Sequence, residues 1–125
     1  MFRQSVPDNI KWEIIIIDNA STDNTSQTAL DTYNRSNCLT PLRVVKENTP
    51  GLSAARQKGF DSAKYEYIVF CDDDNLLKDD FVRTVYEVMS ENEDTGVLGG
   101  QGKAEFYNPP SNWFDEWKNS FAIGK

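Results

Sequence analysis

The sequence contains no histidine and only two cysteines among its 125 residues. Without histidine, the chain cannot form a Ser-His-Asp triad, a Cys-His pair or a histidine-ligated zinc site. Cys38 and Cys71 are too few for a disulfide framework and fit a reducing compartment. These absences leave carboxylate and metal chemistry as the chemistry that the chain offers.

Long hydrophobic runs and an excess of positive charge are missing as well. No apolar run approaches the roughly 20 residues that a membrane-spanning helix needs, and the first residues show no secretory signal pattern. The formal net charge of −7 opposes broad contact with nucleic acid or an anionic membrane. We therefore predict one cytoplasmic domain over residues 1–125, without a nucleic-acid partner or a membrane span. An anionic small ligand can still bind where a metal ion, arginine or lysine neutralises it.

Apolar segments alternate with segments that suit helices. Residues 14–17 are four consecutive isoleucines, which predicts a strand buried on both faces, as in a parallel sheet. Strands alternating with helices predict an α/β fold with a mostly parallel sheet. In the aromatic-rich tail, residues 101–125, we favour a hydrophobic flap over a sugar-stacking surface. The further strands are expected over residues 42–45, 67–71 and 95–100, and the helices over about 25–35, 52–63 and 81–91.

Three consecutive carboxylates follow the strand predicted over residues 67–71. Asp72, Asp73 and Asp74 would repel one another and raise each other's pKa unless a positive group lies among them. Their oxygen atoms suit a hard divalent cation, Mg or Mn, which can hold the phosphates of a nucleotide. The alternative is that they cap the next helix and lie in water. The residues alone leave both interpretations open.

Three sequence blocks occur in a fixed order. They are EIIIIDNASTDNT from Glu13, ENTPGLSAARQKGF from Glu47 and YEYIVFCDDDNLLKDDFV from Tyr65. In this order and spacing they resemble the nucleotide-binding half of family 2 glycosyltransferases, over about residues 12–100. The resemblance implies the GT-A fold, a three-layer α/β/α arrangement with a Rossmann-like sheet. It also implies metal-assisted sugar transfer from a UDP- or GDP-sugar to the hydroxyl of an unknown acceptor, with inversion at the anomeric carbon.

The resemblance also assigns roles to residues at strand ends, where ligands collect in open α/β sheets. It implies that Asp18 lies against the base or ribose of the nucleotide. Arg56 takes the family's arginine position, where its planar fork suits a diphosphate. Asp74 corresponds to the metal-binding carboxylate. Asp72 and Asp73 are both candidates for the nucleotide-sugar site, and Asp72 is a second candidate metal ligand.

Other polar residues have weaker claims to the site. Asp23 is favoured as a helix cap, and Lys58 points away from Arg56 on the predicted helix. Transfer also needs a base that takes the proton from the attacking hydroxyl. Asp115 and Glu116 form an acidic pair in the tail, but they follow the metal motif too soon to match the family's base. An exposed acidic turn is the favoured alternative.

The sequence departs from the family pattern at both ends. Family members begin with a further strand and helix, and this strand would lie between those ending at Asp18 and Cys71. They also continue beyond Lys125, into the segment that normally carries the base. We therefore expect a truncated, inactive piece of a longer transferase, which in full length could lie at the inner face of a membrane. Unpaired sheet edges would invite an oligomer.

Two other functions use the same residues. A nonenzymatic module could bind a nucleotide or metal through the aspartates without any base. A nucleotidyltransferase of similar architecture is the second alternative. It would normally have a basic, glycine-rich phosphate loop at its first strand, and the sequence contains no such loop.

Overall fold

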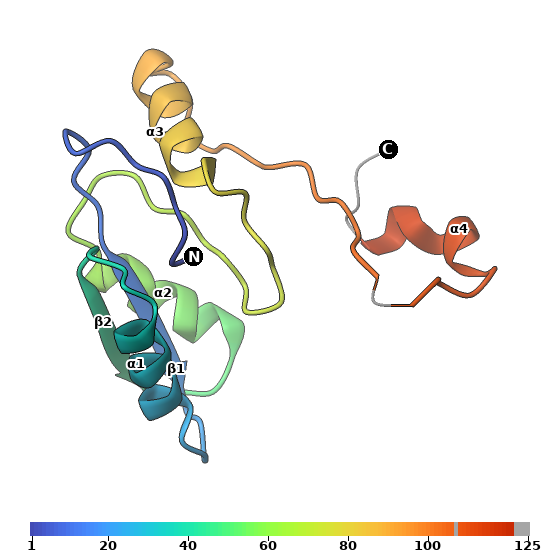
Figure 1. The fold of residues 1–125 in the computed structure, drawn as a ribbon, viewed down its shortest axis with the longest axis horizontal. Helices are drawn as coiled ribbons and strands as arrows, with labels where there is room; N and C mark the ends of the chain where they lie inside the picture. The colour runs from blue at the N-terminus through green and yellow to red at the C-terminus, as the bar shows by residue number, and fades with distance from the viewer. Residues whose placement is uncertain (107, 122–125) are drawn as a thin grey trace. The chain divides into compact units, whose positions relative to one another are not determined.

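The computed structural model describes residues 1–106 and 108–121, and its contacts divide the chain into two compact units, Met1–Asn92 and Glu93–Lys125 (Figure 1). One domain over residues 1–125 stays a prediction. The second unit holds α4 (Phe114–Trp117) and the 3-10 helix η1 (Lys118–Phe121). The first unit holds β1 (Ile14–Asn19), α1 (Thr25–Arg35), β2 (Leu42–Glu47), α2 (Leu52–Ser62) and α3 (Phe81–Glu91).

The first unit is built around a parallel pair of strands. β1 and β2 pair from Ile14 opposite Leu42 to Asn19 opposite Glu47. Helices α1 and α2 each contact both strands, and in Figure 1 α1 lies in front of them and α2 behind. β-branched residues favour the strands, and helices on both faces shield them from water. The predicted α/β class with parallel strands is confirmed.

Two of the predicted strands do not form, so those predictions were wrong. Residues 67–71 and 95–100 lie outside the sheet, whose described part has only the order β1-β2. A strand needs a neighbour for its backbone hydrogen bonds, and no described strand lies on the other edge of β1. Residues 67–71 make side-chain contacts with α2 instead, through rings of Phe60 and Phe70 whose centroids are 5.0 Å apart. Residues 95–100 include three glycines, which weaken a strand.

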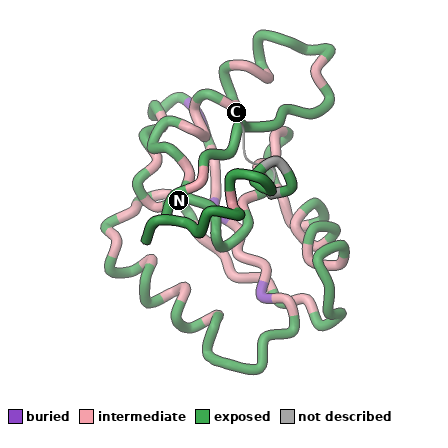
Figure 2. Tube along the Cα trace, turned by 90° about the vertical axis from the view of Figure 1, so that its right-hand side faces the viewer, coloured by how far each residue is buried: buried purple, intermediate pink, exposed green. Residues whose placement is uncertain are grey.

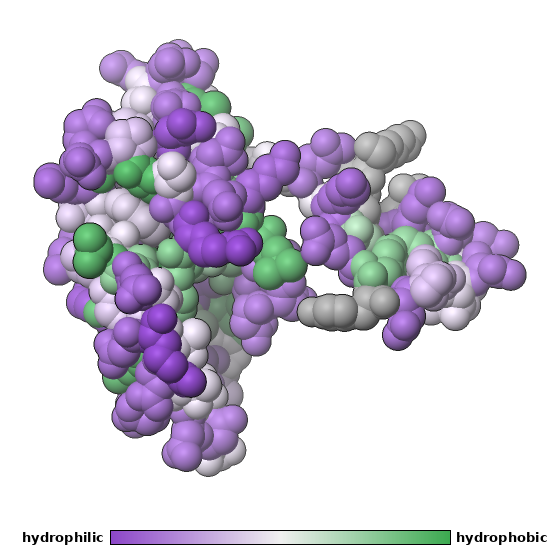
Figure 3. Space-filling view, viewed as in Figure 1, coloured by the Kyte–Doolittle hydropathy of each residue, from purple (hydrophilic) through white to green (hydrophobic). Residues whose placement is uncertain are grey.

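Few side chains are fully shielded from water. Ile10 and Ile14 are the apolar residues described as buried, and Asp18 is a buried polar one. Most of the trace in Figure 2 is exposed or half-buried, and hydrophilic residues dominate the face in Figure 3. No helix in the described part of the chain is long and apolar enough to cross a membrane.

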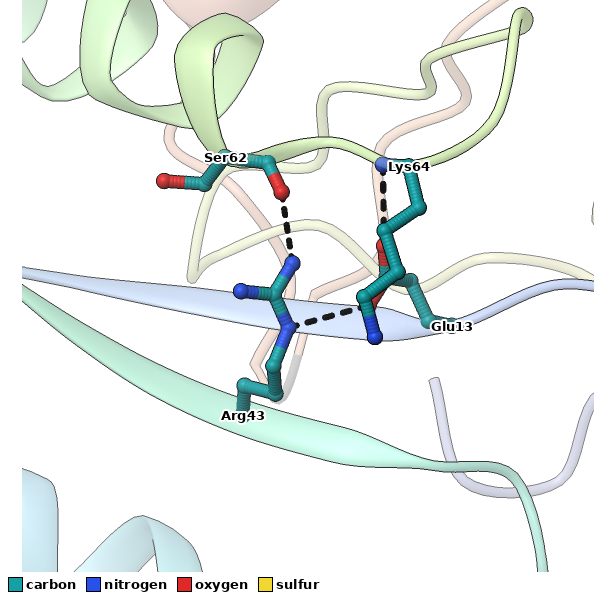
Figure 4. A network of polar contacts seen from close by, with 4 residues as sticks. All are labelled: Glu13, Arg43, Ser62 and Lys64. Carbon is teal, nitrogen blue, oxygen red and sulfur yellow. Dashed lines mark hydrogen bonds and ion pairs between the residues drawn. The ribbon is translucent and has the colours of Figure 1, made fainter.

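A buried glutamate ties both strands to α2 (Figure 4). The Glu13 side chain is 6% exposed, and its Oε2 accepts a hydrogen bond from Arg43 Nε at 3.0 Å. Lys64 N donates to Oε1 at 3.1 Å, and Arg43 Nη2 donates to the Ser62 carbonyl at 2.6 Å. Burial acts to raise the pKa of Glu13, but the hydrogen bonds and charges of Arg43 and Lys64 outweigh it and lower the pKa.

The N-terminal segment holds the start of α3. The helix begins at Phe81, where the sequence predicted it. Val82 N donates to Gln4 Oε1 at 2.9 Å, and Gln4 Nε2 donates to the Lys78 carbonyl at 2.7 Å. The side chain of Gln4 therefore satisfies a backbone N–H of the first turn, which the helix itself leaves without a partner.

Candidate functional site

Asp18, the next-to-last residue of β1, accepts hydrogen bonds from residues that follow the strand. Its side chain is buried at the end of the strand. Oδ1 accepts a hydrogen bond from Ser21 N at 3.3 Å, and Oδ2 accepts one from Ser26 Oγ. The hydrogen bonds from Ser21 and Ser26 hold the pKa of Asp18 below its ordinary range. Asp18 is therefore an ionised, oriented carboxylate, and its contact with a base or ribose stays a prediction.

Asp23 stabilises the start of α1. Its Oδ1 accepts hydrogen bonds from Thr25 N at 3.0 Å and from Thr25 Oγ1. Thr25 is the first residue of α1, so the carboxylate satisfies a donor at the helix start. These bonds lower the pKa of Asp23. The N-cap residue of α1 is Asn24, so Asp23 supports the helix start from one position before the cap that the sequence favoured for it.

Arg56 and Asp72 are brought together from two separate sequence blocks. Arg56 Nη2 lies 3.7 Å from Asp72 Oδ1, and the two side chains are 46% and 55% exposed. The guanidinium carbon also lies 5.8 Å from the centre of the Phe70 ring. An ion pair this exposed contributes no more than about 1 kcal/mol to stability. The guanidinium is therefore open to a stronger anionic partner.

The chain reaches this arrangement through apolar contacts with α2. A Cβ placed on Gly59 would lie 3.6 Å from a ring carbon of Phe70 and 3.9 Å from Ile17 Cγ1. Phe70 and Ile17 therefore converge on the same point of α2. Asp72 follows Phe70 by two residues, and Asp18 directly follows Ile17. The acidic turn thus lies near the carboxyl end of β1, although no strand delivers it there.

The chemistry of the acidic turn fits a metal that is shared with a ligand. Asp72, Asp73 and Asp74 are all exposed, and Asn75 N closes the turn by donating to the Asp72 carbonyl at 3.1 Å. In the described residues, no three acidic or cysteine side chains gather closely enough to hold a metal ion. Magnesium is commonly held by one or two carboxylates together with substrate phosphates and water. Carboxylates of this turn have the oxygen donors for such a site, and metal binding by Asp74 and Asp72 stays a prediction.

Asn19 is a structural element of the site that sequence reasoning missed. Its Nδ2 donates to the carbonyls of Glu47 at 3.3 Å and Thr49 at 2.6 Å. Its Oδ1 accepts from Gly51 N at 2.8 Å. The available signal was an asparagine two positions after the isoleucine run, since its amide can donate and accept at once.

Asp115 and Glu116 lie in the second unit, in the first turn of α4. Both are exposed, and Lys118 Nζ lies 3.4 Å from Asp115 Oδ1. The Phe114 ring contacts Phe106, with centroids 4.8 Å apart. The aromatic tail therefore makes contacts within its own unit. A catalytic role for the two acids stays a prediction.

The family assignment follows from comparison with known proteins. The sequence model described as glycosyl transferase family 2 matches residues 2–122. This match covers nearly the whole chain and includes all three blocks. The chain belongs to glycosyl transferase family 2, as its sequence blocks predicted.

Named relatives are glycosyltransferases from several bacteria. Glycosyltransferase GlyG of Streptococcus pneumoniae is 30% identical over 109 residues, which are 87% of this chain and 32% of the relative. Poly(ribitol-phosphate) beta-N-acetylglucosaminyltransferase TarP of Staphylococcus aureus is 31% identical, over 73% of this chain and 27% of the relative. Putative teichuronic acid biosynthesis glycosyltransferase TuaG of Bacillus subtilis is 34% identical, over 64% of this chain and 31% of the relative.

The chain spans about a third of the length of these relatives. No solved structure matches it.

Proposed function

We propose that this chain forms the donor-binding part of a glycosyltransferase that uses a nucleoside diphosphate sugar, of the UDP- or GDP-sugar type. The observation that carries the proposal is the ion pair between Arg56 and the acidic turn, in which Arg56 Nη2 lies 3.7 Å from Asp72 Oδ1. A permanently charged fork beside metal-binding carboxylates suits a diphosphate and its cation. Family membership supports the same ligand class.

Each residue takes a role that its position supports. Arg56 binds the diphosphate and stabilises the negative charge that grows on it as the sugar departs. Asp74 and Asp72 hold the divalent cation, Mn or Mg, which neutralises phosphate charge. Asp18, kept ionised by its turn, accepts hydrogen bonds from the base or ribose. Asp73 is the alternative ribose partner.

The acceptor is the variable part of this chemistry. The printed names of relatives include poly(ribitol-phosphate), teichuronic acid and cholesterol. Relatives with such different names match this chain over 73%, 64% and 75% of its length. Our proposal for the chain therefore concerns the donor, and its acceptor is any hydroxyl that attacks the anomeric carbon with inversion.

The base that activates this hydroxyl is not assigned. Asp115 and Glu116 are the candidates in the tail, and we favour a structural role for both. We therefore expect no sugar transfer by the 125-residue chain alone. The two free cysteines support a reducing, cytoplasmic location.

Calorimetry with UDP and GDP, each with Mn, with Mg and with a chelator, tests the donor site. We expect one of the two nucleotides to bind in the presence of metal, and the chelator to weaken binding at least about tenfold. Arg56→Ala and Asp74→Ala should each weaken binding about tenfold or more. Arg35→Ala and Asp61→Ala remove the same charges from surface positions on α1 and α2 and should bind as the unaltered chain does.

Two outcomes would contradict the proposal. One is the absence of binding heat for both nucleotides with either metal. The other is unchanged affinity in Arg56→Ala. A nonenzymatic binding module predicts the same heats, so a sugar-transfer assay on the longer protein separates it from a transferase.

A further inference from the structure

Asn19 connects the first two sequence blocks through its side-chain amide. The amide donates to the carbonyls of Glu47 and Thr49 at 3.3 and 2.6 Å and accepts from Gly51 N at 2.8 Å. All three partners are backbone groups: Glu47 is the last residue of β2, and Thr49 and Gly51 lie in the loop between β2 and α2. One side chain at the end of β1 therefore satisfies two backbone groups of the loop, the Thr49 carbonyl and the Gly51 N–H, which lie outside the sheet.

The loop that Asn19 holds leads directly into α2. Gly51 is the N-cap residue, with φ 124° and ψ 148°, a conformation open essentially to glycine alone. Within the described residues, no side chain caps the first turn of α2. Ala55 N donates to the Gly51 carbonyl at 3.1 Å, so the helix begins directly from the residue that Asn19 binds. The position of Gly51 therefore sets where α2 begins.

Arg56 follows Gly51 by five residues, on the second turn of α2. A helix is stiff over one or two turns, so a shift of its first residue moves the side chains that follow. Arg56 Nη2 lies 3.7 Å from Asp72 Oδ1, which is long for an ion pair, and the Arg56 side chain is half-exposed. This weak contact does little to hold the arginine in place. Its direction depends on the backbone that carries it.

The hydrogen bonds from Asn19 to Glu47, Thr49 and Gly51 form a clamp between the end of β1 and the start of α2. A further bond from the residue after Asn19 adds to this clamp. Ala20 N donates to the Glu47 carbonyl at 2.8 Å, beside the bond from Asn19. Ala20, on the carboxyl side of Asn19, is thus bonded to the end of β2, where the loop to α2 begins. A ligand that contacts Asp18 and Arg56 together would meet a preformed spacing between them.

We propose that Asn19 is a positioning residue, which sets the start of α2 and thereby aims Arg56 at the donor diphosphate. The inference rests on the proposed function and adds to it a residue that touches no ligand. Asn19 acts through the hydrogen bonds of its side-chain amide with Thr49 and Gly51. Its loss leaves Arg56 present but misdirected.

Amide hydrogen exchange on the 125-residue chain tests the clamp without any ligand. In Asn19→Ala the Gly51 amide should exchange about tenfold faster, while amides in the middle of β1 keep their protection. Asn48→Ala removes an exposed side chain from the same loop and should leave Gly51 unchanged. Asn19→Ser, whose hydroxyl is too short to span the three groups, is the second variant in case the alanine variant does not fold. Unchanged exchange at Gly51 overturns the proposal.

A double-mutant cycle measured with UDP or GDP and Mn tests the link to Arg56. Asn19→Ala should weaken binding about tenfold, as partners of binding residues commonly do. In an Arg56→Ala background the same change should have little further effect, because Asn19 acts through Arg56. Equal losses in the two backgrounds, or an unchanged affinity in Asn19→Ala, overturn the proposal. If Arg56→Ala itself binds normally, the proposed function fails instead, and hydrogen exchange still decides whether the clamp exists.

Discussion

Three consecutive residues, the last two of β1 and the one after it, make the contacts that shape the candidate site. Asp18 orders the turn by accepting from Ser21 and Ser26, and Asn19 holds the next loop. Ala20, between them and α1, has a positive φ of 55°. A left-handed conformation costs a residue with a Cβ about 1–2 kcal/mol. The turn therefore carries local strain at Ala20.

Ala20→Gly should raise the stability of the chain. Glycine adopts the left-handed conformation freely, although its unfolded state gains entropy, so we expect a net increase of about 0.5–1 kcal/mol. Urea denaturation measures it as a higher midpoint with an unchanged slope. The matched change Ala29→Gly, inside α1, should lower stability by about 1 kcal/mol. A lower midpoint in Ala20→Gly would show that position 20 is not strained.

Gly51 is the opposite case, a residue whose conformation requires glycine. A Cβ at Gly51 would meet nothing within 4 Å, so any cost of Gly51→Ala comes from the backbone. We expect a loss of about 1–3 kcal/mol, measured by urea denaturation. Gly96→Ala also meets nothing within 4 Å but has no positive φ, and it should cost little. Equal effects of the two changes would contradict this account.

At the scale of elements, a polar network holds the amino-terminal side of the strand pair. Glu13 precedes β1, Arg43 lies on β2, and Ser62 and Lys64 lie at the end of α2. The hydrogen bonds among them cross from one element to the next. Because Glu13 is nearly buried, its carboxylate depends on these partners to replace water.

Glu13→Gln should therefore destabilise the strand pair. The amide has nearly the same shape but loses the charge that Arg43 and Lys64 face, and we expect a loss of about 1–3 kcal/mol. The free energy of unfolding from urea titration measures it. Glu66→Gln, at an exposed position, is the control and should change stability by less than about 0.5 kcal/mol. An unchanged free energy of unfolding in Glu13→Gln would mean that the network is not coupled to folding.

For the whole molecule, several carboxylates respond to folding in the same direction. The pKa values of Glu13, Asp18, Asp23 and Glu47 are all lowered. For Glu47 the main cause is the backbone hydrogen bond from Thr49. In mild acid the unfolded chain therefore binds more protons than the folded one. The stability that these groups contribute is fully present above their unfolded pKa values and is lost as the pH falls.

Stability should thus decrease between about pH 5 and pH 3, the range below the ordinary pKa values of glutamate and aspartate. Urea midpoints measured across this range give the slope of stability against pH. Glu13→Gln removes one of the groups and should make the slope shallower. A slope that is equal in both proteins would contradict the lowered pKa of Glu13.

Local sequence patterns predicted the elements that depend on neighbours close in the chain. The helix from Leu52 and the helix from Phe81 begin where the sequence placed them. The isoleucine run forms β1, because α1 returns the chain to lay β2 beside it. Residues 67–71 have an equally strand-like pattern and form no strand. A sequence pattern indicates that a segment can adopt the extended conformation of a strand. Whether it pairs into a sheet depends on which segment lies next to it in the fold.

The sequence by itself determined the family, and it predicted the ligand class and the residues that would approach the ligand. These follow from residue types in ordered blocks, because charge and donor atoms belong to each residue whatever its surroundings. Only the tertiary structure decided that Phe70 packs on α2 and brings Asp72 to Arg56, and that the Asn19 amide binds the start of α2. Such contacts join residues 11 to 32 positions apart, and their geometry depends on how whole elements pack.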